Sequence, residues 1–289
     1  MSSAMQHVLA DVALDDALLA RTRRRLEYFI PSYLEKLVRG SRKVVSVGCG
    51  LGYDVELLLR LGYDTYGLDP GTRTQAWQAY PPDLRSRLRR GFAEDLPFGR
   101  EAFDFAYALE VIEHVGCEDG IWKLLPDAEE IRIRFIESCL DMVKPGGRLF
   151  LSTSNRNCPL DPGHTHHYTR VTDLAGRKLG VPLTVPWHRK NFVWSLGDVK
   201  RALSSSRYAR RCSVVAASSA AYPAFARKAK QSRWHQRLAR LYLQAVDIPV
   251  LRTSFLNPIL AVLIVKNGPE SVAGLLAKAP DALKSRTAF

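Results

Sequence analysis

Three glycines and an aspartate stand at a spacing that can bind a nucleoside. Gly48, Gly50 and Gly52 follow a short apolar run, and Asp69 comes at the end of the next apolar run. Glycine reaches positive φ easily and lets a ligand approach the backbone closely. A carboxylate at the end of a strand can accept hydrogen bonds from both ribose hydroxyls. The alternative is that Asp69 only starts the Asp-Pro-Gly turn at residues 69–71.

The glycine spacing argues against a pyrophosphate ligand. The dinucleotide fingerprint is G-x-G-x-x-G, but the stretch here is G-C-G-L-G, with Tyr53 where the third glycine is required. An NAD-dependent oxidoreductase is therefore a remote interpretation.

Two groups of side chains have the chemistry of acid–base catalysts. Glu110, Glu113 and His114 follow an apolar run closely, and three of the seven histidines lie within residues 164–167. A positioned base accelerates proton removal by roughly 10²–10⁴-fold. The candidate catalytic residues are His114, Glu113 and His166. We favour His114 as the base and the 164–167 group for acceptor binding, while His114 can alternatively only stabilise its turn.

Strands and helices that alternate along the chain must position these groups. Strand patterns occupy residues 44–47, 64–68, 89–92, 103–109 and 148–153, and helical patterns occupy residues 54–61, 74–80 and 128–142. This alternation predicts a parallel sheet with helices on both faces. Further along, we expect a helix over 196–203 capped by Ser195 and strands over 212–217 and 259–266. The first 40 residues are expected to form two helices separated at Pro31.

Five segments between residues 43 and 155 follow the order of one family's motifs. They are residues 47–52, 67–69, 93–98, 103–115 and 144–149. Together they resemble the class I S-adenosylmethionine-dependent methyltransferases of the type 11 kind, with some similarity to ubiquinone-pathway O-methyltransferases. The resemblance implies a Rossmann-like seven-stranded α/β sheet, mostly parallel with one antiparallel strand. Residues 156–289 match only loosely.

The resemblance also implies a cofactor, S-adenosylmethionine, and the residues that hold it. These are Gly48, Cys49, Gly50, Gly52, Asp69, Asp95, Leu96 and Glu110. Asp69 would bind the ribose, and Asp95 would accept from the adenine amino group beside the backbone N–H of Leu96. Glu110 would border the sulfonium at the end of the fourth strand.

A metal role is a further implication of this resemblance. The E-x-x-E-H segment at residues 110–114 resembles one that holds a divalent cation in ubiquinone-pathway O-methyltransferases. Carboxylate and imidazole ligands are chemically reasonable. The same segment occurs in relatives not known to need metal, so a divalent cation is not favoured.

The formal charge of +13 is distributed very unevenly. Residues 1–159 carry a net charge of −2, and residues 160–289 carry +15. Such asymmetry suggests an anionic partner, although a solvated basic surface is the alternative. The aromatic and cationic stretch at 186–194 and a helix with Arg233, Arg237 and Arg240 suit an amphiphilic acceptor or a peripheral membrane contact.

These observations favour methyl transfer to a small-molecule, glycan-precursor or lipid-like acceptor, most readily at oxygen. A nucleic-acid methyltransferase is one alternative. It is weakened because no N/D-P-P-Y/F segment follows the fourth strand and Cys158 is a weak candidate nucleophile. A peripheral membrane or partner-binding protein that retains S-adenosylmethionine without catalysis is the other alternative.

The expected organisation has five parts. They are a helical cap at 1–42, the cofactor half at 43–155, an acceptor-side insertion or lid at 156–210, a completion of the sheet with a basic helix at 211–267, and a peripheral tail at 268–289. The connection at 116–127 is expected to close over the acceptor or to pack as an extra helix.

Composition places the chain among proteins of a reducing compartment. The five cysteines are scattered with no C-x-x-C pair, which argues against a disulfide framework or zinc site. No secretory signal and no apolar run of about 18 residues is present, so we expect a cytoplasmic protein. The alternative is a cytoplasmic protein that makes peripheral contact with the inner face of a membrane.

Overall fold

The computed structural model describes residues 16–118, 123–158, 192–219 and 233–267. Its strands are β1 (Lys43–Val47), β2 (Asp64–Asp69), β3 (Leu88–Arg90), β4 (Phe103–Leu109), β5 (Cys117–Glu118), β6 (Lys123–Leu124), β7 (Val143–Ser154), β8 (Cys212–Ala216) and β9 (Ile259–Lys266). Its α-helices are α1 (Asp16–Phe29), α2 (Glu35–Val38), α3 (Tyr53–Arg60), α4 (Pro82–Arg85), α5 (Ala128–Met142), α7 (Leu196–Ser204) and α8 (Arg233–Val246). Three other helical turns are η2 (Ile30–Leu34), η3 (Thr72–Ala79) and η4 (Ala93–Asp95).

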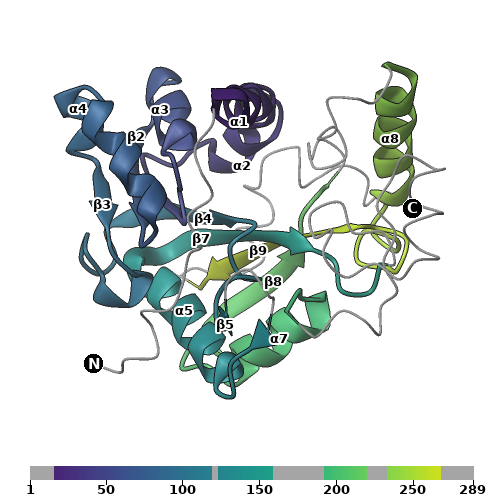
Figure 1. The fold of residues 1–289 in the computed structure, drawn as a ribbon. Coiled ribbons are helices and arrows are strands. Elements are labelled where there is room, and N and C mark those ends of the chain that lie inside the picture. Colours follow the sequence, from purple (N-terminus) through teal and green to yellow (C-terminus); the bar gives the residue numbers. More distant parts are fainter. Residues whose placement is uncertain (1–15, 119–122, 159–191, 220–232, 268–289) are drawn as a thin grey trace.

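One seven-stranded sheet organises the molecule, in the order β3-β2-β1-β4-β7-β9-β8. Every neighbouring pair up to β7 is parallel, whereas β9 runs antiparallel to both β7 and β8. Figure 1 shows α1 to α4 on one side of the sheet and α5 with α7 on the other. The predicted fold, mostly parallel with one antiparallel strand and helices on both faces, is confirmed.

Side-chain alternation along the central strands separates the two helical layers. Val44, Phe105 and Tyr107 pack with the α1–α2 layer. Their neighbours Val45 and Ala106 pack with the α5 layer. The period of two in a strand sends successive residues to opposite faces, so both faces of these central strands are buried and their sequences read as continuous apolar runs.

The helical N-terminal region contains two α-helices on either side of Pro31, as predicted. The separation is not a loop, because residues Ile30–Leu34 form a π-helical turn that joins α1 to α2. Proline lacks an N–H donor, and a wider turn accommodates that loss locally. Ile30, Tyr33 and Leu34 in this turn are buried, so packing against the sheet outweighs the helix-breaking tendency of proline.

Two other expected elements have a different form. Residues 74–80 were expected to be α-helical, but the segment is a 3₁₀ helix, η3, which is common in short connectors. In place of an extra helix at 116–127, β5 and β6 form a small antiparallel pair, and residues 119–122 lie outside the described chain. The strand expected at 148–153 begins earlier, at Val143, with a register irregularity opposite Phe103 and Phe105.

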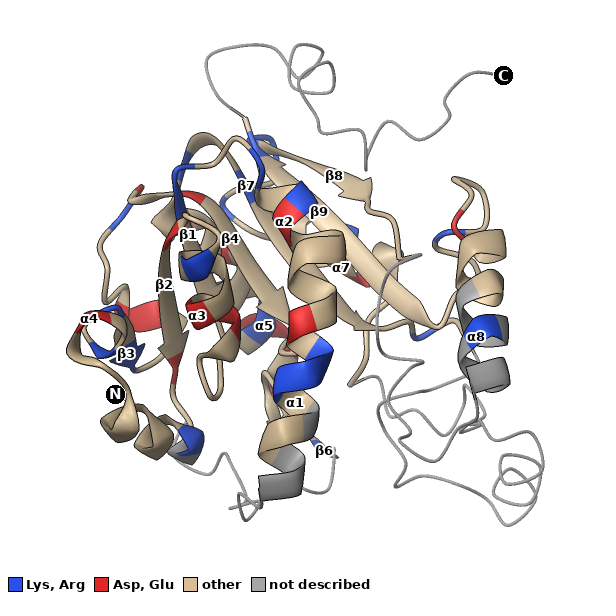
Figure 2. Ribbon diagram, turned by 90° about the horizontal axis from the view of Figure 1, so that it is seen from above, with Lys and Arg blue, Asp and Glu red and all other residues tan. Residues whose placement is uncertain are grey.

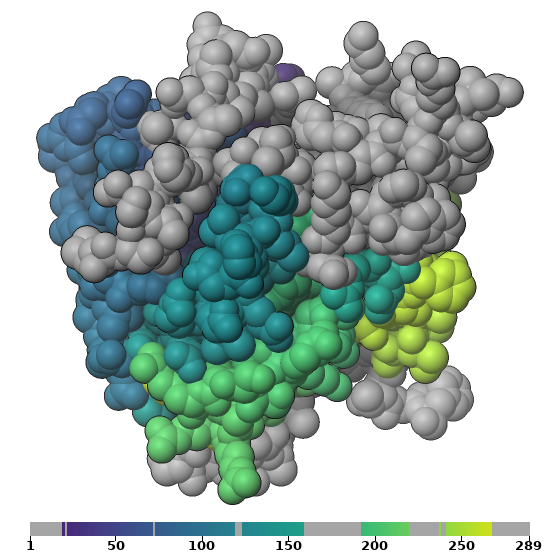
Figure 3. Space-filling view, turned by 60° about the horizontal axis from the view of Figure 1, so that its bottom comes forward, coloured from purple at the N-terminus to yellow at the C-terminus, as the bar shows by residue number. Residues whose placement is uncertain are grey.

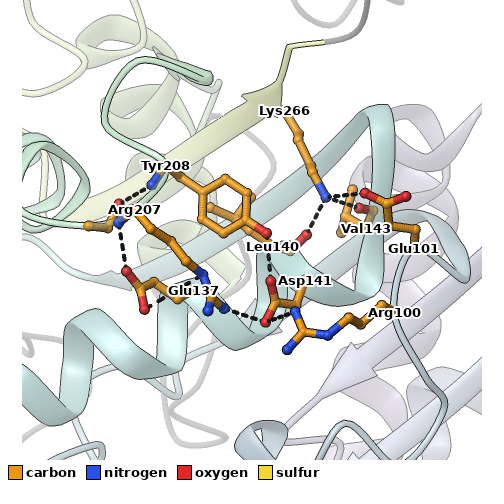
Figure 4. Close-up of polar contacts among 10 residues, drawn as sticks. Arg100, Glu101, Glu137, Leu140, Asp141, Val143, Arg207, Tyr208 and Lys266 are labelled. Carbon is orange, nitrogen blue, oxygen red and sulfur yellow. Dashed lines mark hydrogen bonds and ion pairs between the residues drawn. The ribbon is translucent and has the colours of Figure 1, made fainter.

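A polar network ties β9 and the end of α5 together at the edge of the sheet where the parallel strands begin (Figure 4). Asp141 is 5% exposed, accepts from the Tyr208 hydroxyl at 2.6 Å and pairs with Arg100 at 2.7 Å and with Arg207. Lys266 donates to two backbone carbonyls at the end of α5, at 2.7 and 3.1 Å. Two basic residues of the C-terminal half, Arg207 and Lys266, therefore make structural contacts.

Two negative findings concern the described residues alone. None of their helices combines the length and hydropathy required to span a bilayer. All five cysteines lie in this part of the chain and are free thiols.

Candidate functional site

A glycine loop connects β1 to α3. Gly48, Gly50 and Gly52 have φ values of 77°, 54° and 75°, a region that favours glycine. The backbone N–H groups of Gly48 and Cys49 both donate to the carbonyl oxygen of Leu68 in β2, at 2.7 and 3.1 Å. The loop is thus fixed to the neighbouring strand before α3 begins.

The three glycines of the loop face different surroundings. A Cβ atom at Gly48 would lie 2.5 Å from the side chain of Val111, so glycine is required there for close packing as well as for its φ. A Cβ atom at Gly50 would meet no described atom within 4 Å. Gly50 is therefore the open point of the loop, at which a ligand can approach the backbone.

Two aromatic residues that were not predicted hold the loop from the other side. The indole N–H of Trp77 donates to the carbonyl of Gly50 at 3.0 Å. The hydroxyl of Tyr80 donates to the carbonyl of Leu51 at 2.7 Å. Because burial raises the pKa of Tyr80, this hydroxyl keeps its proton and stays a donor. A tryptophan and a tyrosine three residues apart after a turn were the available signal in the sequence.

Asp69 lies at the end of β2, beside the loop. Its Oδ2 accepts from the Gly50 N–H at 2.7 Å, and its Oδ1 accepts from the Gly71 N–H at 2.7 Å. The residue therefore starts the Asp-Pro-Gly turn and also braces the glycine loop. Each carboxylate oxygen has a second lone pair, so two ribose hydroxyls can still be bound.

A second carboxylate, Asp54, is buried under the loop in the first turn of α3. It is 5% exposed and accepts from the hydroxyls of Ser46 in β1 and, at 2.9 Å, Tyr107 in β4. Its other oxygen, Oδ1, has no hydrogen-bond partner among the described residues. Burial raises the pKa of Asp54 above its ordinary value. The sequence signal was weak, a single acid at a helix position that faces the sheet.

Replacement of Asp54 by asparagine should change how stability depends on pH. A carboxyl whose pKa is raised by folding contributes most stability below its unfolded value of 3.8 and loses it as pH rises through the folded value. The wild type should therefore lose stability relative to Asp54→Asn as pH rises from about 4 towards 7. The difference between their free energies of unfolding should shift in favour of the variant by about 1.4 kcal/mol per unit of pKa difference. Urea denaturation at several pH values measures this. A difference that stays constant with pH would contradict the burial effect.

The turn after β3 contains the two residues expected to hold adenine. Asp95 is exposed, and its carboxylate accepts from the Phe92 N–H at 3.2 Å. Leu96 adopts a φ of 47°, and its N–H already donates to the carbonyl of Ala93 at 3.1 Å. The sequence did not indicate that this N–H is engaged within the turn, so its bond to adenine remains a prediction.

The turn after β4 brings the acidic and histidine candidates to the same edge of the sheet. Glu110 has a φ of 56°, uncommon for a residue other than glycine, and its N–H donates to Ser152 at 3.0 Å. Such strained residues concentrate at functional sites. Glu113 is only 1% exposed, whereas His114 is half-buried, with its backbone N–H bonded to Val111 at 2.9 Å. Because Val111 also contacts Gly48, this turn packs directly on the glycine loop.

A buried arginine that was not predicted connects this turn to the segment before α7. Arg132 is 3% exposed and donates to the carbonyls of Val115 and Phe192, each at 2.8 Å. Its guanidinium also lies over the Trp194 ring, 5.6 Å from the centroid. Burial lowers the pKa of Arg132, but it remains a cation because the ordinary pKa is so high. Arg132 therefore fixes residues 192–194 against the turn that carries His114.

Several predicted features lie outside the described residues. They are His164, His166, His167, Trp122 and most of the stretch at 186–194. The described residues contain no group of three His, Cys, Asp or Glu side chains arranged to hold a metal ion.

The sheet order, the glycine loop after β1 and the carboxylate at the end of β2 together define a class of protein. It is the class I S-adenosylmethionine-dependent methyltransferases, in which ligands bind at the carboxyl ends of the parallel strands.

Comparison with known proteins places the chain within a family. Residues 19–206 match the model of the methyltransferase domain family, and the chain belongs to that family. The ubiquinone biosynthesis O-methyltransferase of Pseudomonas fluorescens is 32% identical over 130 residues, which are 43% of this chain and 49% of that protein. The enzyme of the same name from Photorhabdus laumondii is 34% identical over 123 residues, 40% of this chain and 44% of that protein. The chain therefore spans about half the length of the curated relatives it matches.

Among solved structures, a SAM dependent methyltransferase from Archaeoglobus fulgidus is similar, with a TM-score of 0.48 and 15% identity. The match covers 87% of this chain and all of that one.

Proposed function

We propose that the protein transfers the methyl group of S-adenosylmethionine to an oxygen atom of a small-molecule acceptor. The observation that carries this proposal is the meeting of three features at one edge of the sheet. They are the open backbone at Gly50, the Asp69 carboxylate that braces it, and the strained Glu110 turn that packs on Gly48 through Val111. The match to the methyltransferase family over residues 19–206 supports it.

The residues of this edge fit the chemical groups of the cofactor. S-adenosylmethionine supplies an activated methyl group on a sulfonium. Asp69 would accept the ribose hydroxyls, and Gly50 would let the methionyl part pass over the loop. The positive end of the α3 dipole, beside the glycine loop, suits a carboxylate. Asp95 would bind the adenine amino group, and Glu110 would lie beside the cation.

On the acceptor side, this chain has to orient a hydroxyl and remove its proton. Orientation of the two reactants can lower a barrier by about 7–11 kcal/mol. His114 would take the proton, with the buried Glu113 next to it in the turn. Arg132 would hold residues 192–194 in place as one wall of the acceptor site. His166 would contribute to acceptor binding.

The names of the relatives support oxygen as the methylated atom, since both are O-methyltransferases. The net charge of +15 in residues 160–289 favours an anionic or lipid-like acceptor, or one encountered at a membrane surface. A nucleic acid is less favoured. Figure 2 shows basic and acidic residues intermixed along the described helices and strands.

A labelling experiment tests this function. The protein is incubated with S-adenosylmethionine labelled in its methyl group and with lysate separated into lipid, small-molecule, RNA and protein fractions. We expect base-stable label in the lipid or small-molecule fraction. Label in RNA would support the nucleic-acid alternative. No label in any fraction, with S-adenosylmethionine still bound, would support the non-catalytic one.

Methyl transfer should survive removal of divalent cations. We expect the initial rate in excess EDTA to stay within about twofold of the untreated rate, because proton removal by His114 and orientation can supply the acceleration. The rate is measured before and after dialysis against EDTA, with readdition of Mg²⁺ as the control. A loss that Mg²⁺ restores would instead assign residues 110–114 to a metal site.

A further inference from the structure

Four large apolar side chains are exposed on α8 and in the loop that follows it. Leu241, Ile248, Val250 and Phe255 are 61%, 50%, 83% and 62% exposed. Among the residues whose exposure is described, the other exposed large apolar side chains are Tyr28 and Leu61, at 43% and 47%, and both lie elsewhere in the chain. We name the group of four the apolar ridge. Figure 3 shows the yellow C-terminal part of the described chain at the outer surface of the molecule.

The backbone that carries the ridge is well anchored. The Tyr242 hydroxyl donates to the carbonyl of Leu256, which brings the Phe255 end of the loop against the helix turn that carries Leu241. Asp247 and Arg252 form a buried ion pair at 3.0 Å within the loop. Buried polar contacts thus hold the backbone while the apolar side chains point outward.

The ridge lies at the same edge of the sheet as the glycine loop. Asn155, directly after β7, donates its backbone N–H to Pro258 at 2.9 Å and its side-chain N–H groups to Ser254 and Asn257 at 2.9 and 2.8 Å. The end of β7 is the carboxyl edge of the parallel strands, where β4 ends beside it. The loop at 247–257 is therefore attached to the edge that carries the candidate site.

The charged residues of the segment that carries the ridge are mostly basic. Arg237 is exposed one helical turn before Leu241. The acid at position 247 is the one acidic residue in the sequence from 233 to 258, and its carboxylate is neutralised by Arg252. Exposed apolar side chains beside an exposed arginine, in a segment whose one acid is paired, are a combination suited to the interface of an anionic bilayer.

We propose that the apolar ridge docks the protein on an anionic membrane surface. Four separate side chains that protrude from a loop and a helix end expose on the order of a few hundred Å², which is less than the roughly 800 Å² per partner of a stable protein interface. Side chains that project singly can insert into the boundary between headgroups and acyl chains. The inference deepens the proposed function, since it would place a lipid-like acceptor beside the carboxyl edge of the sheet, but docking itself does not need methyl transfer.

Vesicle co-sedimentation tests the ridge directly. The full-length protein is mixed with vesicles of phosphatidylcholine alone or of phosphatidylcholine with phosphatidylglycerol. We expect binding to the anionic vesicles that weakens with salt. The double variant Val250→Ser/Phe255→Ser should lower the partition coefficient by roughly tenfold or more, because two apolar side chains no longer leave water. Arg237→Glu should lower it by roughly tenfold through charge.

The matched control is Tyr28→Ser/Leu61→Ser, which removes the other two exposed apolar side chains and should leave vesicle binding unchanged. Thermal melting and titration with S-adenosylmethionine confirm that each variant is folded and report the cofactor site separately. Equal vesicle binding by the wild type and the ridge variant would overturn the proposal. So would a self-association detected by sedimentation velocity that the ridge variant abolishes, since the occupant would then be a second copy of the chain.

Discussion

The Asp69→Ala protein is expected to bind S-adenosylmethionine at least about 100-fold more weakly than the wild type. A hydrogen bond to a charged group contributes about 1.5–3 kcal/mol, and the proposed role of Asp69 is to accept two from the ribose. The substitution also frees the N–H groups of Gly50 and Gly71, each held at 2.7 Å, so the glycine loop loses its brace. Isothermal titration calorimetry measures the affinity.

Two further variants show whether this loss is specific. Asp83→Ala removes an exposed carboxylate from α4 and should leave the affinity unchanged. Asp69→Asn keeps one acceptor oxygen but no charge, and should fall between the wild type and Asp69→Ala. Melting temperatures report the structural contribution. An unchanged affinity in Asp69→Ala would mean that Asp69 only forms the turn and does not bind the cofactor.

The His114→Gln protein should lose methyl transfer while it retains the cofactor. We expect kcat to fall by roughly 10²–10⁴-fold, the contribution of a positioned base, because glutamine cannot take the proton from the acceptor hydroxyl. The dissociation constant for S-adenosylmethionine should change little, because we assign its binding to the glycine loop and Asp69. Single-turnover rates with the acceptor found by labelling provide the measurement.

The second histidine group offers the comparison. His166→Gln should raise KM for the acceptor more than it lowers kcat, since we assign His166 to acceptor binding. The reverse pattern, a large fall in kcat for His166→Gln and none for His114→Gln, would move the base to the 164–167 group. Full turnover in both variants would require a base elsewhere or an acceptor that needs none.

Most of the sheet could be predicted because each strand is encoded locally. The strands at 103–109 and 259–266 and the helix at 128–142 agree with the structure residue by residue, since buried apolar runs and helical periodicity are properties of short segments. Ser195 caps α7 as expected, in a reciprocal pair with Asp198. The π-helical turn at Pro31 could not be predicted, because the burial of its neighbours against the sheet overrides a local rule.

The candidate site was predictable only in part. The sequence indicated Asp69 and the three glycines because their spacing relative to two strands has a fixed geometric meaning. Trp77 and Tyr80 after a turn were only a weak signal for the bond to the loop, and nothing indicated that Arg132 would bridge to Phe192. Those contacts join residues between 27 and 60 positions apart, and no periodicity encodes them.

By itself, the sequence determined the order of strands and helices, the conformation of the glycine loop and the position of an acid at the next strand end. Each depends on residue types over short distances, where backbone sterics and burial patterns decide the outcome. Only the tertiary structure decided what the charged residues do. Asp54 is buried beneath the loop. Arg252 and Lys266 make ion pairs and hydrogen bonds inside the protein, whereas Arg237 is exposed one turn before Leu241 of the apolar ridge. A charge count is the same in all these arrangements, because the effect of a charge depends on its burial and partners, which folding alone sets.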